Sequence, residues 1–157
     1  MIIKDLETMG QIAEELRQKG KRIVTCNGAF DILHLGHVRF LQEAKAQGDV
    51  LVVGLNADDS IRRYKAEDRP INSQDARAEV LDALRPVDYV VVFEEETPLA
   101  FLRAVKPEVH CNGEEYGKDC VEAPVLKELG ASLHLIGRIG DYSTTDMLRR
   151  LREGRKT

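Results

Sequence analysis

Two histidines three positions apart are the first side chains in this sequence whose types and spacing could do chemistry. His34 and His37 flank Gly36 and follow a β-rich run that ends at Asn27 and Gly28. At this spacing the two imidazoles share one helical face, and the start of a helix adds unpaired N–H groups and a positive dipole end. Because Gly36 has no side chain, a ligand could approach the backbone closely. The segment predicts a pocket for a polyphosphate.

The same two imidazoles could instead bind a transition metal, or one of them could cap the helix. No further Cys, His or carboxylate stands at metal-ligand spacing, so we expect no protein-bound metal. The G-x-G-x-x-G and G-x-x-x-x-G-K-[ST] patterns are absent from the sequence. The usual dinucleotide and Walker phosphate loops therefore do not apply.

A second group of polar residues lies near the C-terminus. Tyr142, Ser143, Thr144 and Thr145 precede a helical pattern, and Arg138 stands five residues before Ser143. One hydroxyl is enough to cap a helix, so three in a row favour contact with a phosphate or a ribose. This segment therefore predicts a second wall of an anion site.

The elements that must position these groups alternate along the chain. Five short apolar runs cover residues 22–26, 50–55, 87–93, 108–111 and 132–136. Helical patterns lie before, between or after these runs, near residues 6–19, 38–44, 78–84, 99–105 and 143–151. This alternation predicts an α/β fold, a single Rossmann-like, doubly wound, parallel five-stranded sheet with helices on both faces. Ligands of such sheets bind beyond the carboxyl ends of the strands. We expect one domain over residues 1–157, with a helix in residues 1–20 packed on its core.

Composition narrows the function classes. The chain has 157 residues and a formal charge of −4, which argues against non-specific binding of nucleic acid. No apolar run approaches the roughly 20 residues of a membrane helix, and the N-terminus lacks a signal-peptide pattern. Cys26, Cys111 and Cys120 form no C-x-x-C pair, which disfavours a disulfide framework or zinc site. We expect a cytoplasmic protein.

The run Phe30 to His37 fits F-D-x-x-H-x-G-H and resembles the signature of the HxGH nucleotidyltransferases, which include cytidylyltransferases and adenylyltransferases. Residues 142–145 match a second motif of that superfamily. The runs 48–58, 62–65, 68–72 and 76–78 are similar to the D-glycero-β-D-manno-heptose 1-phosphate adenylyltransferase branch. The resemblance implies an enzyme that transfers AMP from ATP to a sugar 1-phosphate, releasing pyrophosphate and giving an ADP-sugar for lipopolysaccharide.

Two alternatives stay open. Arg138 resembles the arginine of the cytidylyltransferase motif R-T-x-G-I-S-T-T, and Asn112 stands where the heptose branch often carries lysine. Both departures favour a CTP-dependent cytidylyltransferase acting on glycerol 3-phosphate or a similar phospho-alcohol. A nucleotide-binding regulator without catalysis is a further alternative, but binding alone does not require every residue of both motifs.

The resemblance also implies roles for individual residues. The catalytic group is His34, His37, Lys65 and Arg77. The nucleotide-binding group is Asn27, Gly28, Ala29, Phe30, Gly36, Asn112, Gly113, Glu115, Arg138, Tyr142, Ser143, Thr144 and Thr145. The acceptor-binding group is Asp31 and Arg63, although Asp31 could be a turn or cap carboxylate and Arg63 could belong to a solvated charged face. Arg77 could instead form an ordinary ion pair within its helix.

The resemblance implies a cofactor and partners as well. Mg²⁺ is expected with ATP, held by phosphate oxygens and water. We expect a homodimer, a separate sugar kinase upstream, and no nucleic-acid or membrane partner.

Overall fold

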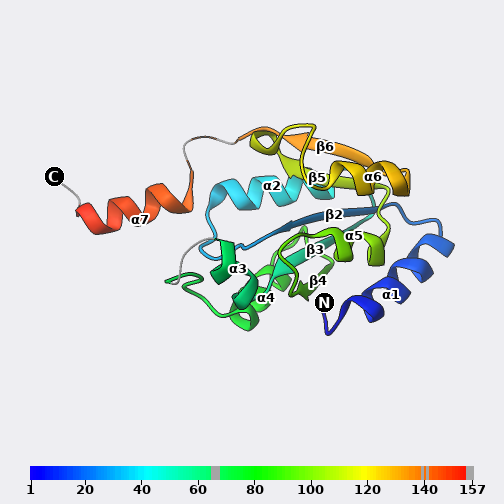
Figure 1. Ribbon diagram of the computed structural model, residues 1–157, viewed down its shortest axis with the longest axis horizontal. Coiled ribbons are helices and arrows are strands. Elements are labelled where there is room, and N and C mark those ends of the chain that lie inside the picture. The colour runs from blue at the N-terminus through cyan, green and yellow to red at the C-terminus, as the bar shows by residue number, and fades with distance from the viewer. Residues whose placement is uncertain (65–67, 139, 141, 155–157) are drawn as a thin grey trace.

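The computed structural model describes residues 1–64, 68–138, 140 and 142–154. Within these residues six parallel strands form one sheet in the order β1-β4-β3-β2-β5-β6 (Figure 1). The strands are β1 (Ile2–Ile3), β2 (Ile23–Gly28), β3 (Val50–Asn56), β4 (Tyr89–Phe93), β5 (Val109–Gly113) and β6 (Ser132–Ile136). The predicted parallel α/β sheet is confirmed, and the sixth strand corrects the predicted number.

The additional strand, β1, is two residues long and lies at the edge of the sheet. Ile2 and Ile3 align with Val90 and Val91 of β4. Two residues carry too little pattern to distinguish a strand from a loop, which is why the sequence did not reveal β1. By contrast, every residue of β3 is buried, in agreement with its continuous apolar run.

Helices cover both faces of the sheet, as predicted. One face packs against α1 (Leu6–Gln18), α5 (Leu99–Val105) and α6 (Ala123–Leu129), and the other against α2 (Leu35–Lys45) and α4 (Gln74–Asp82). The short helices α3 (Asp58–Tyr64) and η1 (Glu114–Tyr116) follow β3 and β5. No helix among the described residues is long and apolar enough to cross a membrane.

Local capping fixes where several helices begin. The Asp5 side chain accepts a hydrogen bond from the Thr8 backbone N–H at 2.7 Å and caps α1. Pro98 is the residue that precedes α5. The helix packs Phe101, Leu102 and Val105 into the core.

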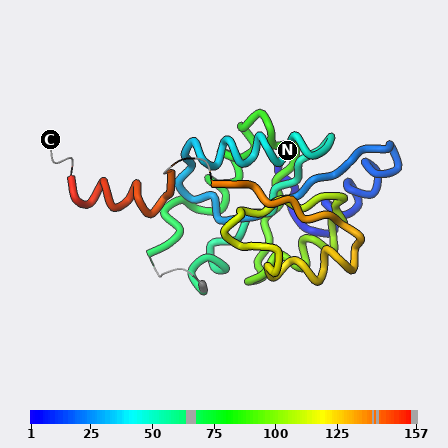
Figure 2. The backbone as a smooth tube through the Cα atoms, turned by 90° about the horizontal axis from the view of Figure 1, so that it is seen from above, coloured from blue at the N-terminus to red at the C-terminus, as the bar shows by residue number. Residues whose placement is uncertain are grey.

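The last helix, α7 (Thr144–Glu153), extends away from the body of the domain, as Figure 2 shows from above. None of its residues is buried. Its N-terminal end nevertheless joins the domain, because the Thr144 hydroxyl donates to the Ile32 carbonyl at 3.2 Å. This contact ties residues 142–145, the hydroxyl segment, to residues 30–37, the histidine turn.

The winding direction of the sheet changes between β2 and β5. The chain runs from β2 to β3 and β4 on one side and then returns to place β5 on the other side of β2. Two neighbouring parallel strands therefore end side by side, at Gly28 and Gly113. This is the point at which ligands of doubly wound sheets bind.

Candidate active site

A cavity of about 580 Å³ opens at the carboxyl ends of β2 and β5. Its walls come from the segment after β2, the segment after β5, the start of α2 and the start of α7. The lining residues are Asn27, Gly28, Ala29, Phe30, Asp31, His34, Gly36, His37, Phe40, Arg69, Asn112, Gly113, Glu115, Tyr116, Ile136, Gly137, Arg138, Tyr142, Ser143, Thr144 and Thr145. The histidine turn and the hydroxyl segment, more than 100 residues apart in sequence, thus share one cavity.

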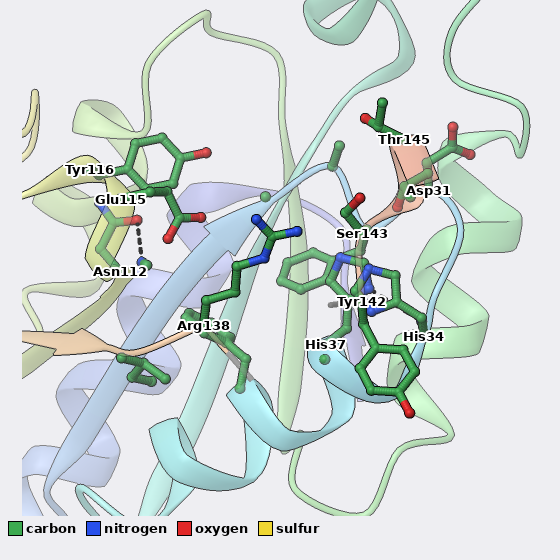
Figure 3. A pocket seen from close by; sticks show the side chains of 18 of the residues that line it. Asp31, His34, His37, Asn112, Glu115, Tyr116, Arg138, Tyr142, Ser143 and Thr145 are labelled. Carbon is green, nitrogen blue, oxygen red and sulfur yellow. Dashed lines mark hydrogen bonds between the residues drawn. The ribbon is translucent and has the colours of Figure 1, made fainter. Parts of the chain in front are cut away.

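The cavity has two distinct ends (Figure 3). Asn112, Glu115 and Tyr116 gather at one end, and Asp31 and Thr145 lie at the other. The two imidazoles and Arg138 lie between these ends. An elongated ligand in this cavity would therefore pass the imidazoles with its middle part.

The two imidazoles are held against each other at the start of α2. His34 is the residue that precedes the helix, and its backbone N–H donates to Nδ1 of His37 at 3.3 Å. The ring centroids of His34 and His37 are 3.9 Å apart. The ring of Tyr142 also stacks on that of His34, with centroids 6.3 Å apart. The helix start and the second motif together orient His34.

The charge state of His34 follows from its surroundings. Burial lowers its pKa below the ordinary value, and the positive charge of Arg138 lowers it further. Its Nδ1 atom is buried and has no hydrogen-bond partner among the described residues. A neutral imidazole with one unpaired nitrogen can bind a polar ligand atom that enters the cavity.

The three hydroxyl groups at the start of α7 have different surroundings. The Ser143 hydroxyl accepts from the Asp146 backbone N–H at 3.0 Å and caps the helix. The Thr144 hydroxyl binds the Ile32 carbonyl, as described above. Thr145 lines the cavity and is exposed, and no described residue forms a hydrogen bond with its side chain. Of the three, Thr145 has the hydroxyl with the greatest freedom to meet a ligand.

The opposite end of the cavity contains a buried amide. Nδ2 of Asn112 donates to Glu122 at 3.4 Å, and its Oδ1 accepts from the Gly113 backbone N–H at 3.1 Å. Both Asn112 and Glu122 are buried. Burial raises the pKa of the neighbouring Tyr116 phenol, and the charges of Glu115 and Glu122 raise it further, so the phenol stays protonated at neutral pH.

The family of this chain follows from comparison with known proteins. The model of a family described as cytidylyltransferase-like matches residues 25–151, which include both motifs. The chain belongs to the cytidylyltransferase-like family. This result confirms the resemblance to the HxGH nucleotidyltransferases and the expected class of enzyme, a nucleotidyltransferase.

Curated relatives of this cytidylyltransferase-like chain are named bifunctional protein HldE. The relative from Aliarcobacter butzleri is 47% identical over 155 residues, which cover 98% of this chain and 32% of the relative. The relative from Wolinella succinogenes is 53% identical over 133 residues, which cover 84% of this chain and 28% of the relative. The chain therefore spans about a third of the length of these curated relatives.

Two solved structures are similar to the cytidylyltransferase-like fold. A lipopolysaccharide core biosynthesis protein from Thermoplasma volcanium is 32% identical with a TM-score of 0.62, covering 79% of this chain and all of that chain. A pantoate-β-alanine ligase from Francisella tularensis is 16% identical with a TM-score of 0.67. The match covers all of this chain and 79% of the ligase chain. The second likeness concerns the fold alone.

The cavity is lined by every residue that was predicted to bind the nucleotide, and also by His34, His37 and Asp31. Lys65 lies outside the described residues. Arg63 is not on the lining; it is exposed and donates to the Glu94 carbonyl at 2.5 Å. Its expected contact with the acceptor stays a prediction.

Arg77 is also absent from the cavity lining. Its fully buried guanidinium donates to the carbonyls of Ala29, Asn56 and Asn72 and pairs with Asp58 at 2.7 Å. These contacts join the turn after β2 to the segments around β3 and α4. The structure thus places Arg77 behind the cavity, where it supports the turn after β2 that forms one of the cavity walls.

Several lining residues were not assigned in the sequence analysis. They are Phe40, Arg69, Tyr116, Ile136 and Gly137. In the sequence, Arg69 was noted only as part of the run 68–72. The structure links it to the site through an ion pair with Asp31 at 2.9 Å, across 38 residues of sequence. Pairing at that separation depends on tertiary structure.

Proposed function

We propose that this domain transfers AMP from ATP to a sugar 1-phosphate, with D-glycero-β-D-manno-heptose 1-phosphate as the acceptor. The products are pyrophosphate and an ADP-sugar. The observation that carries the proposal is the single cavity lined by both imidazoles and by the hydroxyl segment. The relatives named bifunctional protein HldE and the lipopolysaccharide core biosynthesis protein support the acceptor class.

The reaction requires alignment of two anions and stabilisation of charge on the phosphorus oxygens and the leaving group. In this proposal the nucleotide base occupies the end with Asn112, Glu115 and Tyr116. The triphosphate then passes Arg138 and the imidazoles, while the acceptor occupies the end with Asp31. No protein nucleophile is needed, because an acceptor phosphate oxygen attacks the α-phosphorus directly.

Mg²⁺ belongs to the proposal as the ion that accompanies the triphosphate. Among the described residues no group of three or more His, Cys, Asp or Glu side chains could hold a metal ion. Phosphate oxygens and water are therefore the ligands that suit it here, and the ion would offset phosphate charge when bound. The residues of the cavity provide binding and orientation around that charge.

The proposed setting is the cytoplasm, where a sugar kinase supplies the sugar 1-phosphate. The name of the bifunctional relatives, which are about three times as long as this chain, supports a link to a second activity. We also propose a homodimer, which chromatography with light scattering would test.

A second candidate is transfer of CMP from CTP to glycerol 3-phosphate or a similar phospho-alcohol. Arg138 lines the middle of the cavity, and the buried Asn112 lies where the heptose branch often carries lysine. Both observations leave the choice of base open.

Pyrophosphate release tests the two candidates directly. ATP and CTP are each combined with heptose 1-phosphate and with glycerol 3-phosphate, with Mg²⁺ present and with reactions lacking acceptor as controls. We expect turnover only with ATP and heptose 1-phosphate. Turnover with CTP and glycerol 3-phosphate alone would establish the second candidate, and release with no pair would leave a nucleotide-binding domain without this activity.

A further inference from the structure

Arg69 reaches the cavity from the loop between α3 and α4 and is anchored there by Asp31. Its Nε and Nη2 atoms each lie 2.9 Å from Oδ2 of Asp31. The Asp31 side chain is 2% exposed and that of Arg69 is 16% exposed, so the pair lies largely below the surface with the arginine nearer to solvent. A partly buried ion pair of this kind fixes the direction of the guanidinium.

The carboxylate of Asp31 is mostly engaged by its own surroundings, with Arg69 and a backbone N–H on Oδ2 and a second backbone N–H on Oδ1. Besides Arg69 it accepts the backbone N–H groups of Ile71 and Asn72, each at 2.8 Å. The Asn72 amide donates in turn to the Asp31 carbonyl at 2.8 Å. Burial alone would raise the pKa of Asp31, but these hydrogen bonds and the Arg69 charge hold it below its ordinary value. Asp31 therefore acts as the anchor of the loop at residues 69–72.

The guanidinium of Arg69 keeps donors for a ligand. Among the described residues its hydrogen bonds go to Asp31 alone, through the Nε and Nη2 edge. A guanidinium has five N–H groups, so the Nη1 side remains able to donate to an anion in the cavity. Because Arg69 lines the cavity, an incoming phosphate can meet this side.

The position of Arg69 separates it from the other cation of the lining. Of the described lining residues only Arg69 and Arg138 carry a permanent positive charge. Arg138 lies near His34, whose pKa it lowers, in the middle of the cavity. Asp31, which holds Arg69, lies at the end away from Asn112 and the residues around it (Figure 3). Two cations at different points along the cavity suit two separate phosphate groups.

We propose that Arg69 binds the phosphate of the acceptor and that Asp31 is the positioning residue that aims it. The inference rests on the proposed function and adds which residue recognises the second anion. The acceptor class is a phosphomonoester, because a guanidinium matches two oxygens of such a group. Asp31, expected from the sequence to contact the acceptor, acts through Arg69.

The test separates acceptor binding from nucleotide binding. Steady-state kinetics are measured for Arg69→Gln, Arg69→Lys and Asp31→Asn, with Arg62→Gln as a matched control. Arg62 is an exposed arginine that pairs with Asp59 and does not line the cavity. We expect Arg69→Gln to raise the KM for the sugar phosphate about tenfold or more, with the KM for ATP within about twofold of the wild type.

The two further variants distinguish contact from positioning. Arg69→Lys keeps the charge but loses the fork, so we expect a smaller rise in the acceptor KM. Asp31→Asn keeps the size of the anchor but loses its charge, and we expect the same selective rise in acceptor KM. A fall in kcat for every variant with both KM values unchanged would mean that the loop supports the fold and does not bind the acceptor.

A binding experiment keeps this inference distinguishable from the proposed function. Calorimetry measures heptose 1-phosphate and glycerol 3-phosphate binding to protein saturated with a non-hydrolysable ATP analogue. If the wild type binds a phosphomonoester and Arg69→Gln does not, the inference holds even when no turnover is seen and the proposed reaction fails. Equal affinity in both proteins, or no binding to the wild type, would overturn it.

Discussion

The ring of His34 lies so close to Gly36 that a Cβ atom on that glycine would come within 2.9 Å of the Nδ1 and Cε1 atoms of the ring. The glycine therefore makes room for the imidazole at the start of α2. In Gly36→Ala we expect the ring to be displaced and kcat to fall about a hundredfold, as for loss of one preorganised donor.

The same substitution provides its own control for folding. Alanine is favoured over glycine inside a helix by about 1 kcal/mol, so the unfolding temperature of Gly36→Ala should be unchanged or higher. Normal turnover in this variant would contradict the assigned place of the His34 ring. A loss of turnover together with a lower unfolding temperature would point to general damage.

His37 is the second imidazole of the turn, and its ring packs against that of His34. We expect His37→Ala to lower kcat by a factor of about 10² to 10³ with little change in stability. The matched control is His134→Ala, because His134 is partly exposed, contacts Glu43 at 3.2 Å and lies outside the cavity. Equal activity of the two variants would remove His37 from the catalytic group.

The hydroxyls of α7 allow a comparison between neighbours. Thr145→Val should weaken binding of a non-hydrolysable triphosphate by about tenfold without changing stability, because no described residue forms a hydrogen bond with the Thr145 hydroxyl. Thr144→Val should weaken binding too, and should also loosen α7, since it removes the bond to the Ile32 carbonyl. Calorimetry that found wild-type affinity in both variants would refute the contact between this segment and the phosphates.

Arg77 is expected to act on stability. Arg77→Ala removes a buried guanidinium that serves three carbonyls and Asp58, and we expect a loss of about 3 kcal/mol in the free energy of unfolding. Urea unfolding measures this loss directly. A variant that kept its stability but lost kcat would instead restore the catalytic role predicted from the sequence.

His110 of β5 makes stability depend on pH. Its ring is fully buried and its Nδ1 contacts the Thr25 hydroxyl at 2.9 Å, and burial lowers its pKa from 6.5 to about 4. As the pH drops from 6.5 towards 4, the His110 ring becomes protonated in the unfolded chain but stays neutral in the folded protein. The free energy of unfolding therefore falls over this pH range. The shift corresponds to about 3 kcal/mol.

The contribution of His110 is isolated by His110→Gln, which cannot titrate. Stability should be measured from pH 7 to pH 4 in both proteins, since carboxylates also titrate near the lower limit. We expect a flatter pH dependence in the variant, even if its stability at pH 7 is lower. Parallel curves would show that His110 is not the group responsible.

The sequence was most informative where a pattern of residue types fits only one environment in the fold. The run 50–55 is apolar throughout because both faces of its strand are buried, so the strand and the parallel sheet could be predicted. The positions of the imidazoles and hydroxyls followed from the rule that ligands bind beyond strand ends. The individual cavity residues after β2 and β5 were predicted from the resemblance to the HxGH nucleotidyltransferases.

The sequence was least informative about arginines in polar segments. Arg63, Arg69 and Arg77 all follow β3 within a charged stretch, and nothing local distinguishes the exposed one, the cavity one and the buried one. Their environments depend on distant partners such as Asp31 and on packing behind the sheet. Tertiary structure is therefore needed to assign their roles.

We propose that the residues of the cavity transfer the AMP part of ATP to an acceptor phosphate. The most direct measurement compares two batches of ATP, one radiolabelled at the α-phosphorus and one at the γ-phosphorus, in reactions with heptose 1-phosphate and Mg²⁺. We expect the α label to appear in the sugar nucleotide and the γ label in pyrophosphate. Transfer of the γ label to the sugar, or no label in any sugar product, would contradict it.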